Sequence, residues 1–342
     1  MSSGRAAAPP LSEVVAVLEE LYPSRWAEDW DRVGLVCGDP EAPVERVLLA
    51  VDPAPEVVAE AVAARADLLL AHHPLLLRGV SSVAATTSKG RAVHDLVRAG
   101  CALYTAHTNA DSARPGVSDA LARVLGLTGL VPLAPAPVDP LDKVVAFVPA
   151  DRAPALLEAL WAAGAGTLGD YHRVAWTSTG AGTFTPGAAA HPALGTPGHR
   201  EDVPEARVEV LVPRGRREAV LSALRSAHPY EEPAFDVLEQ APWSGPRGLG
   251  RTGSLARPVT LRAFAEVVAA ALPATAGGGP PYLVDVAHWA REWPWLNGAA
   301  ERLAAALAQR GAAVSTSVSS RRTDPWTFHV PSTVPTSEGT SR

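Results

Sequence analysis

DLLLAHHP, residues 67–74, is a short, continuous apolar run that ends at two histidines and a proline. Helical sequence follows at residues 89–100, and a second apolar run, ALYTA at 102–106, ends at another histidine, His107. An earlier run, VLLAV at 47–51, precedes a further helical segment. Apolar runs that alternate with helices are typical of parallel strands covered on both faces. We therefore expect an α/β fold with a mostly parallel sheet.

The composition is that of a folded protein. Of the 342 residues, 47% are hydrophobic and 19% are charged, which is enough apolar mass for two or three domains. The net charge of −6 leaves no basic surplus to neutralise phosphates, so we expect no nucleic-acid partner.

Neither a membrane anchor nor a secretion signal is expected. No apolar stretch is long and uninterrupted enough to span a bilayer as a helix, and MSSGRAAAPP at residues 1–10 lacks the apolar core of a signal peptide. Cys37 and Cys101 are too few to staple a chain of this length or to form a cysteine zinc site. These features predict a cytoplasmic protein with no membrane partner.

The middle of the chain contains an internal repeat. Residues 143–166 realign on residues 207–230, and each copy has the pattern of a strand, a turn and a helix. Two such halves predict a ferredoxin-like α+β domain, inserted at residues 141–240. Proline-rich sequence at 132–140 and glycine-rich sequence at 241–250 predict linkers on either side.

The last segment has too few strands for a sheet of its own. It offers a helix at 260–272, a strand at 283–287 and then a long helix and a short strand. We therefore predict that residues 1–137 and 246–330 are the two halves of one α/β domain, because insertion between neighbouring chain ends is tolerated. The final residues, 331–342, are expected to be a disordered tail.

Three of the apolar strands end at histidines. The carboxyl ends of parallel strands share one edge of a sheet, where ligands bind. The strand at 283–287 ends at His288, and Glu292 follows one helical turn later on the same face. The side chains expected at this edge are His72, His73, Asp111, His288 and Glu292, with His107 nearby. Five or six nitrogen and oxygen ligands without a thiolate suit one or two ions such as Zn, Fe, Mn or Co.

Each of these motifs alone has a simpler interpretation. A pair of histidines is more often part of a loop, and a histidine four residues before a glutamate occurs on many solvent-facing helices. HTNAD at 107–111 is compatible with a turn held by its Asn and Asp side chains. Their common position at strand ends favours a metal site. His228, within AHPYEEP at 227–233, has no strand-end companions and is more typical of a structural or interface motif.

Taken together, the motifs resemble those of a dinuclear metal-centre, hexamer-forming family, the GTP cyclohydrolase type 2 homologues (NGG-one-interacting factor three-like), in its long form with an inserted domain. The motifs are WDRVGLVCGDP (30–40), AHHPLLLRG (71–79), AHTNAD (106–111), DVAHWAREWP (285–294), STSVSS with TDPWTFH (315–329), and in the insert GAGTLGDY (164–171), GAGTFTPG (180–187) and AHPYEEPAFDV (227–237). They cover nearly the whole chain.

This resemblance implies a site for two divalent metal ions. Its ligands would be His72, His73, Asp111, His288 and Glu292, with His107 as an additional candidate. It also implies a homohexamer and a small-molecule substrate. The chain departs from the family pattern at residues 273–281, where GGGPP replaces a further strand, turn and helix. The second half of the metal-binding domain is therefore expected to be shortened.

We expect a metal-dependent hydrolase that acts on a nucleotide or phosphoester, because paired ions lower the pKa of a bound water and hold the oxygens of a substrate. Asn109 or His107 would orient the ligands. The alternative is a noncatalytic metal-binding, trafficking or regulatory protein whose insert senses a small molecule or a partner. Turnover of a nucleotide or phosphoester panel by the metal-loaded protein separates the two hypotheses.

Overall fold

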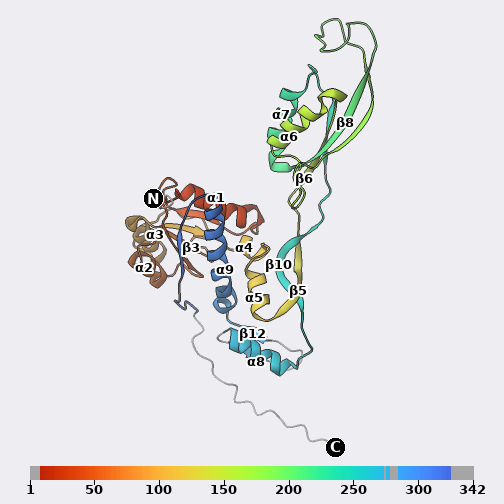
Figure 1. Cartoon of the computed structure of the whole chain (residues 1–342). Helices are drawn as coiled ribbons and strands as arrows, with labels where there is room; N and C mark the ends of the chain where they lie inside the picture. Colours follow the sequence, from red (N-terminus) through yellow and green to blue (C-terminus); the bar gives the residue numbers. More distant parts are fainter. Residues whose placement is uncertain (1–7, 273–274, 278–283, 325–342) are drawn as a thin grey trace, which may run out of the picture. The chain divides into compact units, whose positions relative to one another are not determined.

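The computed structural model describes residues 8–272, 275–277 and 284–324 (Figure 1). The chain forms two compact units, of which unit 1 comprises Met1–Ala136 with Gly245–Arg342, and unit 2 comprises Pro137–Ser244. The expected disordered tail and most of the GGGPP segment lie outside the described residues. Among the described residues, no helix combines the length and the hydropathy that crossing a membrane requires.

Unit 1 contains a five-stranded sheet with the order β1-β4-β3-β2-β13. Its strands are β1 (Gly34–Cys37), β2 (Arg46–Ala50), β3 (Leu68–Ala71), β4 (Ala102–Thr105) and β13 (Ser315–Val318). The last four are parallel to one another, whereas β1 pairs antiparallel with β4. Ala71 pairs with Ala50 on one side and Thr105 on the other. The carboxyl ends of three strands therefore lie side by side.

Four helices cover this sheet, α1 (Leu11–Leu21), α2 (Pro55–Ala63), α3 (Ser88–Ala99) and α9 (His288–Gln309) (Figure 1). Leu68 and Leu70 of β3 pack with α1 and α9, whereas Leu69 and Ala71 pack with α2 and α3. Successive side chains of a strand point to opposite faces. The whole run is apolar because both of its faces are buried, and each buried leucine contributes about 1.5–3 kcal/mol.

Two further pairs of strands belong to the rest of unit 1. β5 (Leu127–Pro137) and β10 (Ser244–Leu255) pair with each other, and β11 (Thr275–Gly277) pairs antiparallel with β12 (Val284–Val286). The remaining short elements are η1 (Ser24–Trp26), α4 (Thr108–Ser112), α5 (Val117–Val124) and α8 (Leu261–Ala271).

The β5–β10 pair corrects the linkers expected at 132–140 and 241–250. Much of both segments is strand, because each strand of a two-stranded sheet has one free edge, where a proline without an N–H is tolerated. Gly248 is required by the close approach of the strands. Its φ is +146°, and a Cβ there would lie 2.2 Å from the carbonyl oxygen of Ala134.

Unit 2 is an antiparallel sheet with the strand order β7-β8-β6-β9. Its elements follow the order β6 (Leu141–Pro149), η2 (Ala150–Arg152), α6 (Ala153–Ala162), β7 (Trp176–Phe184), β8 (Glu201–Pro213), η3 (Arg214–Arg216), α7 (Arg217–Ala227) and β9 (Phe235–Glu239). Both copies of the repeat are a strand, a short 3-10 turn and a helix. One apolar core joins the sheet to α6 and α7, through side chains such as Val144, Leu156, Val208 and Leu224. The molecule is therefore a mixed α/β fold with parallel and antiparallel sheets.

A buried carboxylate holds the start of β6 to the turn before α7. Asp142 is fully buried and accepts hydrogen bonds from Arg214 at 3.1 Å and from Arg217 at 2.8 and 3.0 Å. The Arg217 guanidinium therefore holds the pKa of the Asp142 carboxyl below its usual value, despite burial, and Arg214 adds to the effect.

Candidate metal centre

The ends of β3 and β4 bring three histidines together. His72 and His73 follow β3 directly, and His107 follows β4 by two residues. The ring centroid of His72 lies 5.1 Å from that of His73 and 5.2 Å from that of His107. One ring nitrogen from each histidine lies within 4.8 Å of the other two. This spacing is compatible with ligands of a common ion.

The first turn of α9 adds a second group. His288 is the first residue of the helix, and Glu292 lies one turn further on, where its Oε1 is 2.9 Å from His288 Nε2. His73 Nε2 lies 2.9 Å from Glu292 Oε2 and 3.1 Å from His288 Nε2. His73 therefore belongs to both groups of candidate ligands.

His72 has a buried ring nitrogen with no hydrogen-bond partner. Its Nδ1 donates to the carbonyl of Ala106 at 2.8 Å, so in the neutral ring Nε2 carries only a lone pair. That Nε2 is buried without a partner among the described atoms. It faces Asp111 Oδ1 at 3.9 Å and Glu292 Oε1 at 3.8 Å. All six residues expected at this edge of the sheet therefore lie in one cluster.

Burial sets the charge of the innermost groups. It lowers the pKa of His72 to about 4, against the attraction of Glu292, so the ring is neutral at neutral pH. Burial and the negative charge of Glu292 raise the pKa of Asp111 to about 6. The cluster thus combines a neutral nitrogen donor with carboxylates that repel each other, and a cation bound between them would offset this repulsion.

Carboxylates behind the rings orient two of the histidines. Asp52 Oδ1 accepts from His73 Nδ1 at 2.7 Å, and its other oxygen accepts from the Thr323 hydroxyl. Burial disfavours a charged His73, but Asp52 and Glu292 raise its pKa to about 9. A divalent cation between these groups would replace the proton that the two carboxylates hold on the ring.

Asp31 serves His107 in the same way. Its Oδ1 accepts from His107 Nδ1 at 2.9 Å, and Oδ2 accepts from the backbone N–H of Thr108 at 3.0 Å and from its hydroxyl. Burial opposes ionisation of Asp31, but these hydrogen bonds hold its pKa well below the usual range. Asn109 is fully buried and accepts from the backbone N–H of His107. It therefore positions the His107 backbone rather than a ligand ring.

Asp31 and Asp52 were not among the site residues predicted from the sequence. Asp52 follows the apolar residues 47–51 just as His72 follows β3, so the strand-end rule already pointed to it. Asp31 had a weaker signal, because it lies in a loop between η1 and β1 with no strand before it.

Arg291 is a half-exposed cation beside the cluster, and its Nη2 donates to His288 Nδ1 at 2.7 Å. A guanidinium has no acceptor, so this hydrogen bond requires a lone pair at Nδ1 and leaves the proton of the neutral ring at Nε2. Metal binding through His288 Nε2 needs the opposite tautomer. The Arg291 contact would therefore have to open if His288 Nε2 bound an ion.

Comparison with known proteins identifies the family. Residues 9–281 match the family model described as Duf34/NIF3 (NGG1p interacting factor 3). The chain belongs to the Duf34/NIF3 family. A Mycobacterium leprae protein named GTP cyclohydrolase 1 type 2 homolog is 45% identical over 369 aligned residues, which cover 92% of this chain and 94% of that protein. A Streptomyces coelicolor protein of the same name is 38% identical over 330 residues, which cover 96% and 97%.

Solved structures show the same Duf34/NIF3 fold. A Bacillus cereus protein related to NIF3 superposes with a TM-score of 0.78 at 29% identity, over 94% of this chain and all of that one. The Staphylococcus aureus protein SA1388 superposes with a TM-score of 0.76 at 22% identity, over 94% and 99%, which shows the fold alone.

The residues of this Duf34/NIF3 chain fit a divalent cation on their own geometry. His72 Nε2 is buried, and its lone pair has no hydrogen-bond donor among the described atoms. Glu292 Oε2 is also buried without a hydrogen-bond partner among the described atoms, although it lies 2.9 Å from His73 Nε2. Two ligands about 2.0–2.2 Å from one Zn²⁺ ion lie about 3–4 Å apart. The 3.8 Å between His72 Nε2 and Glu292 Oε1 is within that range.

Proposed function

We propose that this Duf34/NIF3 protein binds two divalent metal ions at the carboxyl edge of β3 and β4, and hydrolyses a nucleotide or phosphoester there. The observation that carries the proposal is the buried lone pair of His72 Nε2, which has no hydrogen-bond partner among the described atoms. It faces oxygens of Asp111 and Glu292 at 3.9 and 3.8 Å with no proton to share. A nitrogen lone pair and two carboxylate oxygens repel one another unless a cation lies between them.

The division of the ligands supports two ions rather than one. The groups His72–His73–His107 and His73–His288–Glu292 overlap only at His73. The single lone pair of an imidazole nitrogen serves one ion, whereas a carboxylate has two oxygens and can bridge a pair. Glu292 has both of its oxygens among these histidines and is the candidate bridge.

A pair of such ions supplies an activated water and a clamp for the oxygens of the substrate. The chain's own residues supply orientation and charge. Asp52 and Asp31 fix the rings of His73 and His107. Arg291, whose contact with His288 would open if that ring bound a metal ion, would then be available to an anionic substrate. The nucleotide class rests on the name of the relatives, GTP cyclohydrolase 1 type 2 homolog.

The test combines metal content with turnover. Elemental analysis of the protein after dialysis against a dilute chelator should give two ions per chain, and the loaded protein should turn over members of a nucleotide and phosphoester panel. His72→Ala should lose both properties. His94→Ala is the matched control, because His94 is exposed on α3 outside the cluster. Two bound ions without turnover would support the noncatalytic metal-binding alternative, and absence of bound metal would refute the site.

We also propose that the chain assembles as a cytoplasmic homohexamer, as its family resemblance implies. Light scattering on the purified protein should then give about six times the 35.6 kDa of one chain. A monomeric or dimeric mass would refute the hexamer.

We propose, in addition, that residues 141–240 form an autonomous ferredoxin-like domain. The βαββαβ order of its elements, the strand order β7-β8-β6-β9 and its own apolar core support this.

A further inference from the structure

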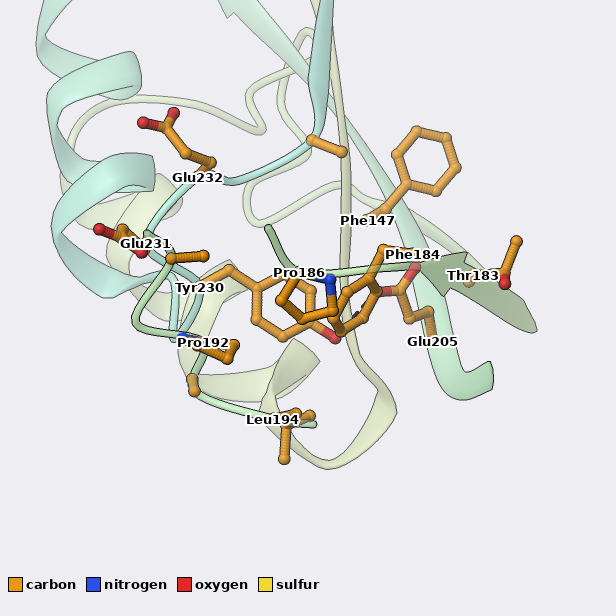
Figure 2. A pocket seen from close by; sticks show the side chains of 14 residues that line it. Phe147, Thr183, Phe184, Pro186, Pro192, Leu194, Glu205, Tyr230, Glu231 and Glu232 are labelled. Atoms are coloured by element: carbon orange, nitrogen blue, oxygen red, sulfur yellow. Dashed lines mark hydrogen bonds between the residues drawn. The ribbon is translucent and has the colours of Figure 1, made fainter. Parts of the chain in front are cut away.

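Unit 2 contains a cavity of about 370 Å³ (Figure 2). Its walls come from Phe147 of β6, Phe184 of β7, Glu205 of β8 and the segment that follows α7. Two motifs that the metal centre does not use, GAGTFTPG at 180–187 and AHPYEEPAFDV at 227–237, both contribute to the lining. The volume is in the range of sites for small molecules.

Most of the wall is apolar or aromatic. The rings of Phe184 and Tyr230 lie against each other with centroids 5.7 Å apart and planes at 59° (Figure 2). Phe147 supplies a third ring, and prolines, alanines and Leu194 complete the wall. Such a surface accepts the hydrocarbon part of a ligand, and the faces of aromatic rings attract a positive charge.

The charge of the lining is entirely negative. Glu205, Glu231 and Glu232 are its ionisable carboxylates, and none of the lining residues is a lysine, arginine or histidine. Glu205 Oε1 accepts the hydroxyl proton of Tyr230 at 3.0 Å, which leaves the second carboxylate oxygen for a ligand. Glu231 accepts from the backbone N–H of His191 at 3.0 Å. The lining itself therefore offers no counter-charge to an anion such as a nucleotide, although two groups outside it touch lining residues: the Arg207 guanidinium lies 5.7 Å from the Phe147 ring centroid, and His191 Nδ1 lies 4.0 Å from Glu231 Oε1.

Gly182 and His228, one from each of these two motifs, fix the shape of the cavity around Glu205. A Cβ at Gly182 would lie 2.0 Å from Glu205 Oε2, so the glycine leaves room for the carboxylate to lie across β7. His228 is buried, donates from Nε2 to the Phe147 carbonyl at 2.9 Å and accepts from the Tyr230 N–H at Nδ1 at 3.1 Å. Burial lowers the pKa of His228 and keeps the neutral ring that this pattern requires.

We propose that this cavity binds a small organic cation, an ammonium group carried on an aromatic or aliphatic body. The cationic nitrogen pairs with Glu205, and the body packs against Phe147, Phe184 and Tyr230. His228 and Gly182 are positioning residues, because they act through Tyr230, Phe147 and Glu205. All of these residues belong to unit 2, whereas the candidate metal ligands all belong to unit 1.

Three probes of similar size test the charge preference on the unmodified chain. Benzylammonium, benzyl alcohol and benzoate share one ring and differ in the charge of the polar group. Isothermal titration calorimetry, with ligand-observed NMR for the weak binders, should show saturable binding of benzylammonium, at least tenfold weaker binding of benzyl alcohol, and no binding of benzoate. Benzylammonium should bind equally well to chelator-treated and zinc-loaded protein, which excludes the carboxylates of the metal centre as its site.

Variants then assign the site. Glu205→Gln keeps the shape of the side chain and an acceptor for Tyr230 but removes the charge, so it should weaken benzylammonium binding about 10- to 100-fold and leave benzyl alcohol unchanged. Glu218→Gln is the matched control, because Glu218 is exposed on α7 outside the lining. Phe184→Leu should weaken both ligands. Circular dichroism of each variant confirms that it is folded.

Equal affinities for benzylammonium and benzyl alcohol would overturn the proposal, and this result needs no variant. Equal effects of Glu205→Gln and Glu218→Gln would overturn it as well. Binding of benzylammonium that is lost as the protein concentration rises would assign the cavity to a second copy of the chain instead.

Discussion

Replacing Glu292 by glutamine should lower the affinity for metal ions far more than removing the ring of His107. The glutamine keeps the volume of a buried side chain but removes a charge whose oxygens lie 2.9 Å from His73 Nε2, 2.9 Å from His288 Nε2 and 3.8 Å from His72 Nε2. At an effective dielectric constant of about 20, a unit charge about 4 Å from another contributes about 4 kcal/mol. This corresponds to a loss of about a thousandfold in affinity.

His107→Ala removes a nitrogen ligand from only one of the two groups. We therefore expect a loss of about 10- to 100-fold, comparable to the loss of an orienting group. Zinc titration against a chromophoric chelator measures both affinities, and elemental analysis after dialysis counts the ions that remain. Glu292→Gln should lose both ions, whereas His107→Ala should keep at least one. The bridging role of Glu292 is refuted if Glu292→Gln keeps two ions at wild-type affinity while His107→Ala loses them.

Three further changes have defined outcomes. Asp52→Asn, which disturbs the hydrogen bond to His73, should weaken zinc binding about 10- to 100-fold in the same titration. The control is Asp67→Asn, which should leave zinc binding unchanged, because the Asp67 carboxylate contacts backbone N–H groups and Arg46 at the start of β2. Equal effects of the two variants would contradict the role of Asp52. Excising residues 141–240 should leave a soluble remainder that binds metal by elemental analysis, and an insoluble or metal-free product would contradict the autonomy of the insert. The pKa of Asp142 is lower in the folded protein than its usual value, so the stabilisation from its ionised form is complete above the usual pKa of an aspartate and is lost as pH falls through the lower folded value. Asp142→Asn should therefore lower the thermal midpoint at pH 7 by several degrees, and by progressively less toward pH 3. A difference in thermal midpoint that stays constant with pH would rule out the contacts of Asp142 with its arginines as the cause.

The parts of the fold that were predictable are those in which burial determines the sequence. β2, β3 and β4 are apolar along their length because helices cover both faces, so residues 47–51, 68–71 and 102–106 could be read as strands. β1 (Gly34–Cys37) is only partly buried, and its short GLVC sequence has no distinctive period. The β5–β10 pair was taken for linkers because prolines and glycines give the same signal in a free segment and in a two-stranded sheet.

The residues of the candidate site that could be predicted are those that the chain topology alone brings together. Strand ends and one helical turn were enough to place His72, His107 and Glu292 together. The roles of Asp31 and Asp52 depend on which ring lies in front of each carboxylate. That is a property of tertiary packing, and no spacing in the sequence encodes it. The cavity of unit 2 was missed for the same reason, because its two motifs lie about 40 residues apart and meet only across the sheet.

The division of the candidate ligands between the two ends of the chain has a consequence for synthesis on the ribosome. Asp111 and His288 are separated by 177 residues, which take about 9–35 s to translate at about 5–20 residues per second. During that interval the growing chain carries His72, His73 and His107 but lacks α9, and the edge of β2 has not yet received β13. Unit 2 leaves the ribosome complete before unit 1 can close. The cluster of candidate ligands therefore cannot form completely until the last quarter of the chain has been translated. The insert has to fold while unit 1 is still incomplete.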